Sequence, residues 1–306
     1  MRANPPRLLL ALALPAFSSS FLSSPTAPLP SPHPTLLPTL LSARLPRSPS
    51  PRCEAKTWDE LGLREELISA LNSQQIPSPN PLQASSLPMI MGRASVVLGA
   101  QTGSGKTLAY LAPVMQNLKI DEEERGGRGR AKRPRALVLL PTRELSLQVR
   151  DVAKSLSSHL KLSVSVIHGG VPEGPQRRQL NLPIDLLIAT PGRLVQHLDK
   201  ANVHLGGVRY VVLDEVDTMF EQGFGPELDK ILAITTRDLS HDVRALEEGR
   251  GRVQHLAVGA THPAEALAAY DKWLGGAKRL FVESHHSLPA SLEQRFITCA
   301  ADAKVG

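Results

Sequence analysis

The 306-residue chain is long enough for one large domain or two small ones, and its 42% apolar and 4% aromatic residues predict a sizeable, mainly aliphatic core. The net charge of +6 does not argue for nucleic acid binding. Residues 1–53 hold five of the 35 basic residues and no acidic ones, which leaves 30 basic against 29 acidic residues in 54–306. Two cysteines and ten scattered histidines exclude a disulfide framework and argue against a metal site built from them.

The first 53 residues are predicted to form a disordered targeting leader. Arg2 and Arg7 precede the apolar run Leu8–Phe17, which is too short to cross a bilayer, and a Ser/Pro-rich stretch without acidic residues follows to Arg52. The apolar run resembles a secretory signal, and the continuation resembles a transit peptide. Together they favour plastid import. Mitochondrial import, an ordinary disordered tail and a misplaced start codon are the alternatives, and no stable membrane association of the mature protein is expected.

From residue 54 onwards, short apolar runs alternate with helical stretches. This alternation predicts an α/β fold with a mostly parallel sheet and helices on both of its faces. Polar residues follow directly after the strand ends, where open α/β sheets bind their ligands. The predicted strands are Val96–Ala100, Ala136–Leu140, Leu162–Ile167, Ile184–Ala189, Tyr210–Leu213 and His255–Val258.

The segment Asp121–Arg135 interrupts this pattern with four acidic residues, followed by a pair of adjacent glycines and then a basic cluster. It is predicted to be a solvated loop between a helix and a strand, with an RNA-contacting loop as the alternative.

The segment Ala100–Thr107 has the pattern Ala-x-x-x-x-Gly-Lys-Thr between a predicted strand and a predicted helix. Its glycines let several backbone N–H groups and the helix N-terminus point at phosphate oxygens. Lys106 is expected to contact the β- and γ-phosphates, and Thr107 to bind Mg²⁺. The strict pattern has Gly where Ala100 stands, and a Gly-rich turn with a surface lysine is the alternative. The residues expected to contact the nucleotide here are Thr102, Gly103, Ser104, Gly105, Lys106 and Thr107.

Three carboxylates follow the strand at Tyr210–Leu213, and alone they would be compatible with a solvated turn. Downstream of a phosphate loop, they indicate a site for hydrolysis. Asp214 is expected to hold Mg²⁺ largely through water. Glu215 is expected to orient and deprotonate the attacking water. With Lys106, these two residues are the candidate catalytic groups.

These motifs and their neighbours resemble the DEAD-box RNA helicase family over about Lys56–Val282. The segment Gln75–Gln83 is similar to the family's adenine-reading segment. The resemblance assigns adenine recognition to Gln83 and adenine stacking to Trp58. Three further motifs resemble the family's RNA-backbone motifs, in the family's order, and comprise Pro141, Thr142, Arg143, Gly169, Gly170, Thr190, Pro191, Gly192 and Arg193.

The resemblance implies a P-loop NTPase fold of the RecA type, with ATP and Mg²⁺ as cofactors. It implies RNA as the partner, bound through its backbone without sequence preference, and it allows for protein cofactors. Gln75 and Asn80 stand where the family usually has Gly and Thr or Ser, and Val216 stands within Asp-Glu-Val-Asp in place of Ala. Gly259 replaces a serine whose hydroxyl would contact the last acid. The residues expected to couple hydrolysis to strand separation are Asp217, Gly259, Ala260 and Thr261.

The predicted organisation is a leader at 1–53, a RecA-like ATP-binding domain at 54–284, and a linker with the start of a second domain at 285–306. Leu288–Val305 resembles that linker and first strand, and the closing His-x-x-Gly-Arg-x-Gly-Arg motif does not occur in the sequence. The expected function is an ATP-dependent RNA helicase in which ATP binding and hydrolysis are coupled to RNA binding and local unwinding, with weak stand-alone activity. A non-catalytic RNA- or protein-binding adaptor and a truncated gene model are the alternatives.

Overall fold

The computed structural model describes residues 57–126, 129–236, 252–262, 264–274 and 276–281. All of them belong to one compact unit, Pro51–Gly306. The predicted leader at 1–53 and the predicted second-domain segment at 285–306 lie outside the described residues. No helix among the described residues has both the length and the apolar composition needed to cross a membrane.

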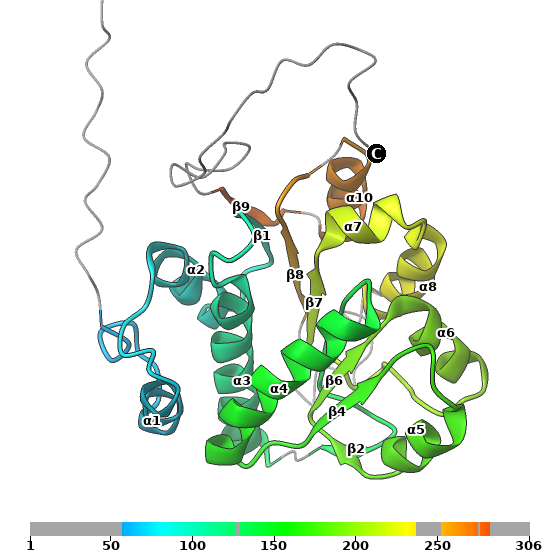
Figure 1. Cartoon of the computed structure of the whole chain (residues 1–306), viewed down its shortest axis with the longest axis horizontal. Coiled ribbons are helices and arrows are strands. Elements are labelled where there is room, and N and C mark those ends of the chain that lie inside the picture. Colours follow the sequence, from blue (N-terminus) through cyan, green and yellow to red (C-terminus); the bar gives the residue numbers. More distant parts are fainter. Residues whose placement is uncertain (1–56, 127–128, 237–251, 263, 275, 282–306) are drawn as a thin grey trace, which may run out of the picture. The chain divides into compact units, whose positions relative to one another are not determined.

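Seven strands of the described chain form a single sheet in the order β4-β6-β3-β7-β8-β1-β9, and every neighbouring pair is parallel (Figure 1). Nearly every residue of the first six of these strands is buried, as expected for a parallel sheet covered on both faces. The predicted α/β fold is therefore confirmed. The bounds are β1 Val96–Gly99, β3 Ala136–Leu139, β4 Val164–Ile167, β6 Leu186–Ala189, β7 Tyr210–Asp214, β8 Gln254–Gly259 and β9 Lys278–Phe281.

Helices cover the two faces of the sheet with separate hydrophobic cores. One core joins the sheet to α1 (Glu65–Ser73), α2 (Pro81–Met91), α3 (Lys106–Arg125) and α4 (Arg143–Leu160). The other joins it to α5 (Glu173–Leu180), α6 (Pro191–Asp199), α7 (Val216–Glu221), α8 (Gly225–Thr235) and α10 (Ala264–Leu274). Strand residues contribute to the two cores alternately, since successive side chains point to opposite faces: Leu98 belongs to the first core and Val97 to the second. In Figure 1, α2 and α3 lie on the opposite side of the sheet from α6, α8 and α10.

Two features of the sheet were not anticipated. The strand predicted at Ile184–Ala189 is divided, because Asp185 separates β6 from β5 (Pro183–Ile184), which pairs antiparallel with β2 (Arg130–Ala131). The edge strand β9 pairs with β1 but has mostly exposed residues, so it lacks the apolar run that identified the other strands.

The acidic segment starting at Asp121 is not the predicted solvated loop. Helix α3 continues to Arg125, so all four acids lie in its C-terminal turns. Asp121 is 1% exposed and accepts hydrogen bonds from Arg93 (2.7 Å) and from the hydroxyl of Tyr210 (2.9 Å), with Arg209 at 3.2 Å. These partners come from distant parts of the chain, so the acidic run ties α3 to its neighbours.

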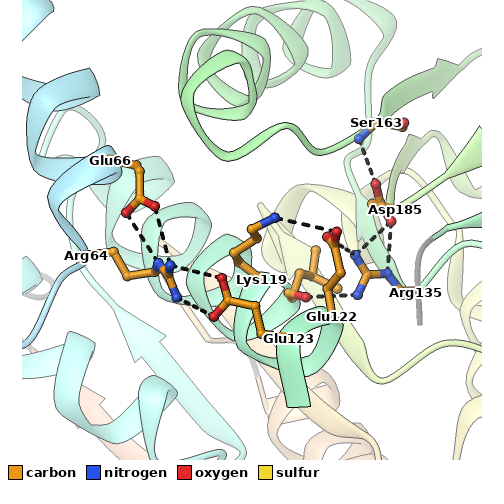
Figure 2. A network of polar contacts seen from close by, with 9 residues as sticks. Arg64, Glu66, Lys119, Glu122, Glu123, Arg135, Ser163 and Asp185 are labelled. Carbon is orange, nitrogen blue, oxygen red and sulfur yellow. Dashed lines mark hydrogen bonds and ion pairs between the residues drawn. The ribbon is translucent and has the colours of Figure 1, made fainter. Parts of the chain in front are cut away.

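Figure 2 shows further polar contacts around the C-terminal turns of α3. Arg64 donates to Glu123 at 2.7 Å, which links the start of α1 to the end of α3. The buried Arg135, expected in a loop, donates to Asp185 at 2.9 Å, and Asp185 accepts from the Ser163 N–H at 2.7 Å. Arg135 therefore fixes the starts of β3 and β6 beside each other, at the end of the sheet away from the predicted site.

Candidate functional site

The predicted site residues gather along one edge of the sheet, where the strands end. The phosphate loop follows β1, the three carboxylates follow β7, and the coupling segment follows β8. Because β7, β8 and β1 are neighbours in the sheet, these three segments lie side by side. The predicted RNA motifs follow β3, β4 and β6, which form the adjoining part of the same sheet. The two groups meet at the β3–β7 pair.

The phosphate loop has the backbone shape that an anion-binding loop requires. Gly103 and Gly105 have φ angles of +78° and +79°, which side chains other than glycine rarely adopt. Helix α3 starts directly afterwards at Lys106, so its free N–H groups point into the loop. The Ser104 hydroxyl is buried without a hydrogen-bond partner among the described residues. An unpaired buried donor in such a loop fits a phosphate oxygen as its missing acceptor.

Asn80 and Gln83 tie the predicted adenine-reading segment to the phosphate loop. They form a reciprocal capping box at the start of α2, in which each side chain accepts from the other's backbone N–H at 2.9 Å. The side-chain amide of Asn80 also donates to the carbonyl of Ser104 (2.9 Å), and that of Gln83 donates to Gly105 (3.2 Å). A Cβ at Gly105 would lie 2.6 Å and 2.7 Å from these two amide nitrogens, so the contact requires glycine.

These contacts explain how Asn80 can stand where the family usually has Thr or Ser. Its side chain caps the helix and still reaches the loop. Gln83 is 3% exposed, and its amide keeps one N–H and one lone pair beyond the bonds described. This is the pair of groups that recognition of an adenine edge would use.

Trp58 does not have the predicted adenine-stacking position. Its side chain is 1% exposed and packs in the core among α1 and α2, so neither ring face is available to a ligand. The indole N–H donates to the carbonyl of Ile76 at 3.0 Å. Trp58 therefore holds the segment before Asn80 in place from inside the core. In the conformation described, it cannot stack on an adenine ring.

Lys106 lies among the carboxylates but is not paired with one. Its ammonium donates to the carbonyls of Ala100 (2.7 Å) and Gln101 (3.1 Å). Burial lowers the pKa of Lys106, while the charges of Asp214, Asp217 and Glu215 oppose that shift. A cation held by two carbonyls can exchange these bonds for phosphate oxygens without breaking an ion pair.

Asp214, the last residue of β7, is 5% exposed and accepts two hydrogen bonds. Oδ1 accepts from the Glu215 N–H at 3.0 Å, and Oδ2 accepts from the hydroxyl of Tyr110 at 2.8 Å. Burial raises the pKa of Asp214 to about 6, against the effects of Tyr110 and Lys106. Burial also raises the pKa of Tyr110, which keeps its hydroxyl protonated as the donor.

Glu215 directly precedes α7 as its N-cap residue and has a φ of +54°, a left-handed conformation that is unusual for a residue with a side chain. Burial raises its pKa, and the charge of Asp217 adds to the shift. Glu215 lines a pocket of about 370 Å³ together with Lys106, Thr107 and Asp214. Residues of α4, mostly apolar and including Val149, also line this pocket. The structure thus brings the three predicted catalytic residues and the predicted metal-binding threonine to one cavity.

Asp217 accepts three hydrogen bonds on one carboxylate oxygen despite the glycine at position 259. Its Oδ2 accepts from the N–H groups of Ala260 (3.1 Å) and Thr261 (2.9 Å) and from the Thr261 hydroxyl (3.0 Å). The Gly259 Cα stands beside Oδ1, since a Cβ there would be 3.3 Å from that oxygen. The α7 acid and the segment after β8 are therefore connected without the serine hydroxyl that the family resemblance led us to expect.

The predicted RNA residues form a second group at the ends of β3, β4 and β6. The Thr142 hydroxyl caps α4 by accepting from the Leu145 N–H at 3.3 Å, and it is followed by the exposed Arg143. Gly170 has a φ of +77°, and a Cβ on it would lie 3.6 Å from the Arg143 guanidinium.

Arg193 connects the third predicted RNA motif to the second. It donates to the carbonyl of Val171 at 3.0 Å, next to the Gly169–Gly170 pair. Thr190 and Pro191 are buried at the start of α6, whereas Gly192 is partly exposed. Backbone approach at the glycines and charge from Arg143 are thus available to a polyanion, while Thr190 and Pro191 position the helix.

Tyr110 is the functional candidate that sequence reasoning missed. It lies three residues after Thr107, so its side chain is on the same side of α3 one turn further along. A tyrosine at a core position of a helix is ordinarily explained by packing. The only available signal was a hydroxyl that must find a buried partner close to the phosphate loop.

Fold and site together define a RecA-like P-loop NTPase domain. The family model for DEAD/DEAH box helicases matches residues 80–269. The chain belongs to this family, as its sequence motifs suggested.

Relatives and solved structures agree with this assignment. The chain is 41% identical over 242 residues to DEAD-box ATP-dependent RNA helicase 39 of Arabidopsis thaliana, an alignment that covers 79% of this chain and 38% of that protein. It is 38% identical over 178 residues to ATP-dependent RNA helicase DBP2 of Chaetomium thermophilum, covering 58% and 31%. The chain thus spans about a third of the length of these relatives.

Among solved structures, a DEAD box protein from Methanococcus jannaschii superimposes with a TM-score of 0.63 at 27% identity, covering 74% of this chain and 56% of that one. An ATP-dependent RNA helicase from Sulfolobus tokodaii, described as hypothetical, gives a TM-score of 0.60 at 26% identity, with coverage of 72% and 57%. The observed sheet and helices therefore correspond to a RecA-like domain of DEAD-box proteins.

Proposed function

We propose that this chain is the ATP-binding part of an ATP-dependent RNA helicase, in which ATP binding and hydrolysis are coupled to RNA binding and local duplex unwinding. The observation that carries the proposal is the strand order. The predicted phosphate loop and its acidic partners follow β1, β7 and β8, and the three predicted RNA-backbone motifs follow the adjoining strands β3, β4 and β6, which supports the proposal.

ATP is proposed to lie across the segment joined by Asn80 and Gln83. Gln83 recognises the adenine edge with its remaining N–H and lone pair, while the loop N–H groups, the Ser104 hydroxyl and Lys106 hold the phosphates. Glu215 orients and deprotonates the attacking water. The raised pKa of this carboxyl makes it a better base than an ordinary exposed glutamate.

Mg²⁺ is proposed to bind with the nucleotide, and it would neutralise the charge that develops on the phosphates during transfer. Among the described residues, no group of three or more His, Cys, Asp or Glu side chains could hold a metal ion. Asp214 and Thr107 line the same cavity. One carboxylate and one hydroxyl suit Mg²⁺, since this ion usually takes its other ligands from substrate phosphates and water.

RNA is proposed to bind along the β3–β6–β4 part of the edge through its sugar–phosphate backbone. Arg143 offers a guanidinium for a phosphate, and Gly169, Gly170 and Gly192 allow a close approach of the chain. Coupling would pass from the carboxylates through Asp217 to Ala260 and Thr261. The whole helicase reaction would involve regions that the relatives have and that this alignment does not cover.

Nucleotide binding by the 306-residue chain tests the core of the proposal. Lys106→Ala is expected to weaken ATP binding at least tenfold, because a buried cation beside the phosphates is lost. Lys272→Ala removes an exposed lysine paired with Asp229 and serves as the charge-matched control. Equal ATP affinity of Lys106→Ala and the wild type would contradict the ATP site and favour an adaptor role.

RNA binding is tested by Arg143→Ala. We expect weaker binding to single-stranded RNA of any sequence and a salt dependence reduced by about one phosphate contact. A change restricted to particular base sequences would contradict backbone recognition.

Residues 1–53 are proposed to direct import into a plastid, in line with the apolar run and the acid-free continuation. Fusion of residues 1–53 to a fluorescent protein tests this proposal in algal or plant cells. Fluorescence in mitochondria or in the cytosol would contradict it.

A further inference from the structure

A buried tyrosine lies behind the carboxylate proposed to receive Mg²⁺. Tyr110 is fully buried on α3, and its hydroxyl donates to Oδ2 of Asp214 at 2.8 Å. The other oxygen, Oδ1, accepts from the Glu215 N–H at 3.0 Å. The Asp214 carboxylate is therefore held by one donor on each oxygen, and the two donors come from different elements, α3 and the β7–α7 junction.

We infer that Tyr110 is a positioning residue that fixes the orientation of Asp214 for the hydrated Mg²⁺ of a bound nucleotide. This inference rests on the proposed function. A carboxylate held only at Oδ1 could still turn about its Cβ–Cγ bond, whereas a second donor at Oδ2 fixes its plane. Mg²⁺ keeps several waters in a strict octahedral arrangement, so the direction of the acceptor oxygens matters. Partners behind a metal ligand commonly set its orientation.

The position of Tyr110 makes this role specific. Thr107, three residues earlier on α3, lines the pocket together with Asp214. The same turn of helix thus supplies the hydroxyl proposed to touch Mg²⁺ and the hydroxyl that holds Asp214. The Tyr110 ring packs in the core between α3 and the sheet, so its hydroxyl cannot follow a moving ligand. The Tyr110 hydroxyl therefore keeps a fixed position from which it donates to Asp214.

The fold contains a matched pair that separates this role from ordinary packing. Tyr210, the first residue of β7, is 1% exposed and donates to Oδ2 of Asp121 at 2.9 Å. Asp121 is also buried and accepts from Arg93. In both pairs, the hydroxyl of a buried tyrosine donates a hydrogen bond to a buried carboxylate. Asp214 and Tyr210 stand at opposite ends of the same strand, so the second pair is remote from the nucleotide pocket.

The test compares Tyr110→Phe with Tyr210→Phe in the 306-residue chain. Binding of a fluorescent ADP analogue is measured in EDTA and in Mg²⁺, followed by a Mg²⁺ titration at fixed nucleotide. We expect Tyr110→Phe to need about tenfold more Mg²⁺ than the wild type, with unchanged affinity in EDTA. Tyr210→Phe is expected to match the wild type in both titrations, while both variants lower the thermal midpoint.

The inference is overturned by a wild-type Mg²⁺ requirement in Tyr110→Phe, by an equal loss of affinity with and without Mg²⁺, or by the same shift in Tyr210→Phe. Adding Tyr110→Phe to Asp214→Asn should change the Mg²⁺ requirement no further, and an additive shift would also overturn it. Failure of the proposed function has a different signature, namely no Mg²⁺-dependent nucleotide binding by the wild type.

Discussion

Replacing Gly259 by serine, the residue usual in the family at this position, is expected to destabilise the fold. A Cβ at this position would lie 2.9 Å from the carbonyl oxygen of Thr261, 3.2 Å from Cε1 of His262 and 3.3 Å from Oδ1 of Asp217. The first contact is with backbone, so the segment after β8 must shift to relieve it. Overpacking of this kind costs about 1–3 kcal/mol.

The expected loss is measurable by urea unfolding and by thermal denaturation. For a domain of this size, each kcal/mol lowers the midpoint by about 2–4 °C, so a fall of roughly 4–8 °C is expected for a cost of about 2 kcal/mol. Gly174→Ser is the matched control, because a Cβ at Gly174 meets nothing within 4 Å. A Gly259→Ser variant as stable as the wild type would show that the Asp217 contacts do not depend on the absence of a side chain at 259.

Three further predictions concern buried groups described above. Trp58→Ala should cost about 3–5 kcal/mol of unfolding free energy by urea denaturation, since it empties a core site; a stable variant that loses only nucleotide affinity would restore the stacking role. Asp121→Ala should lower the unfolding free energy by about 3–5 kcal/mol, because it leaves buried partners without their acceptor. The control Glu123→Ala, at an exposed site, should lower it by less than about 1 kcal/mol. Equal losses in the two variants would contradict the buried network. Without nucleotide or metal, Asp214→Asn should be more stable than the wild type at pH 7, by on the order of 2–3 kcal/mol. The raised pKa means that wild-type Asp214 binds a proton in the folded state between about pH 4 and 6 but not when unfolded, so its contribution falls as the pH rises through that window. The variant's advantage should vanish near pH 4, and an advantage that is independent of pH would refute the assignment.

The sheet was largely predictable, because buried parallel strands leave contiguous apolar runs such as Ala136–Leu139 and Leu186–Ala189. Strand β9, which pairs with β1, escaped this signal, since most of its residues are charged or exposed. The acidic run that starts at Asp121 was misinterpreted for a related reason. The partners Arg93 and Arg209 are distant in sequence. Local composition therefore predicted a solvated loop, whereas the folded chain brings these two arginines to the buried carboxylate.

The site was predictable where a motif fixes a backbone shape, as at Gly103 and Gly105. Side-chain burial was not predictable in this way. Motif spacing placed Trp58 near the adenine segment but could not show that it supports Ile76 from inside the core. Nor could spacing reveal the Tyr110–Asp214 hydrogen bond, because it joins residues 104 positions apart, one in α3 and the other in β7. The motifs predict which residues contact a ligand, and the structure adds the buried residues that hold these motif residues in place.

The β3–β7 pair has a consequence for communication between the two halves of the edge. Leu139 is paired with Leu213, so the next residues, Leu140 and Asp214, follow side by side on the two chains, and both line the same cavity. Neighbouring strands are about 4.8 Å apart. A polyanion bound at Thr142 would therefore lie two residues along the chain from Leu140, which lines the same cavity as Asp214. In the proposed function, the path between the nucleotide and the RNA would be no longer than one step across the sheet.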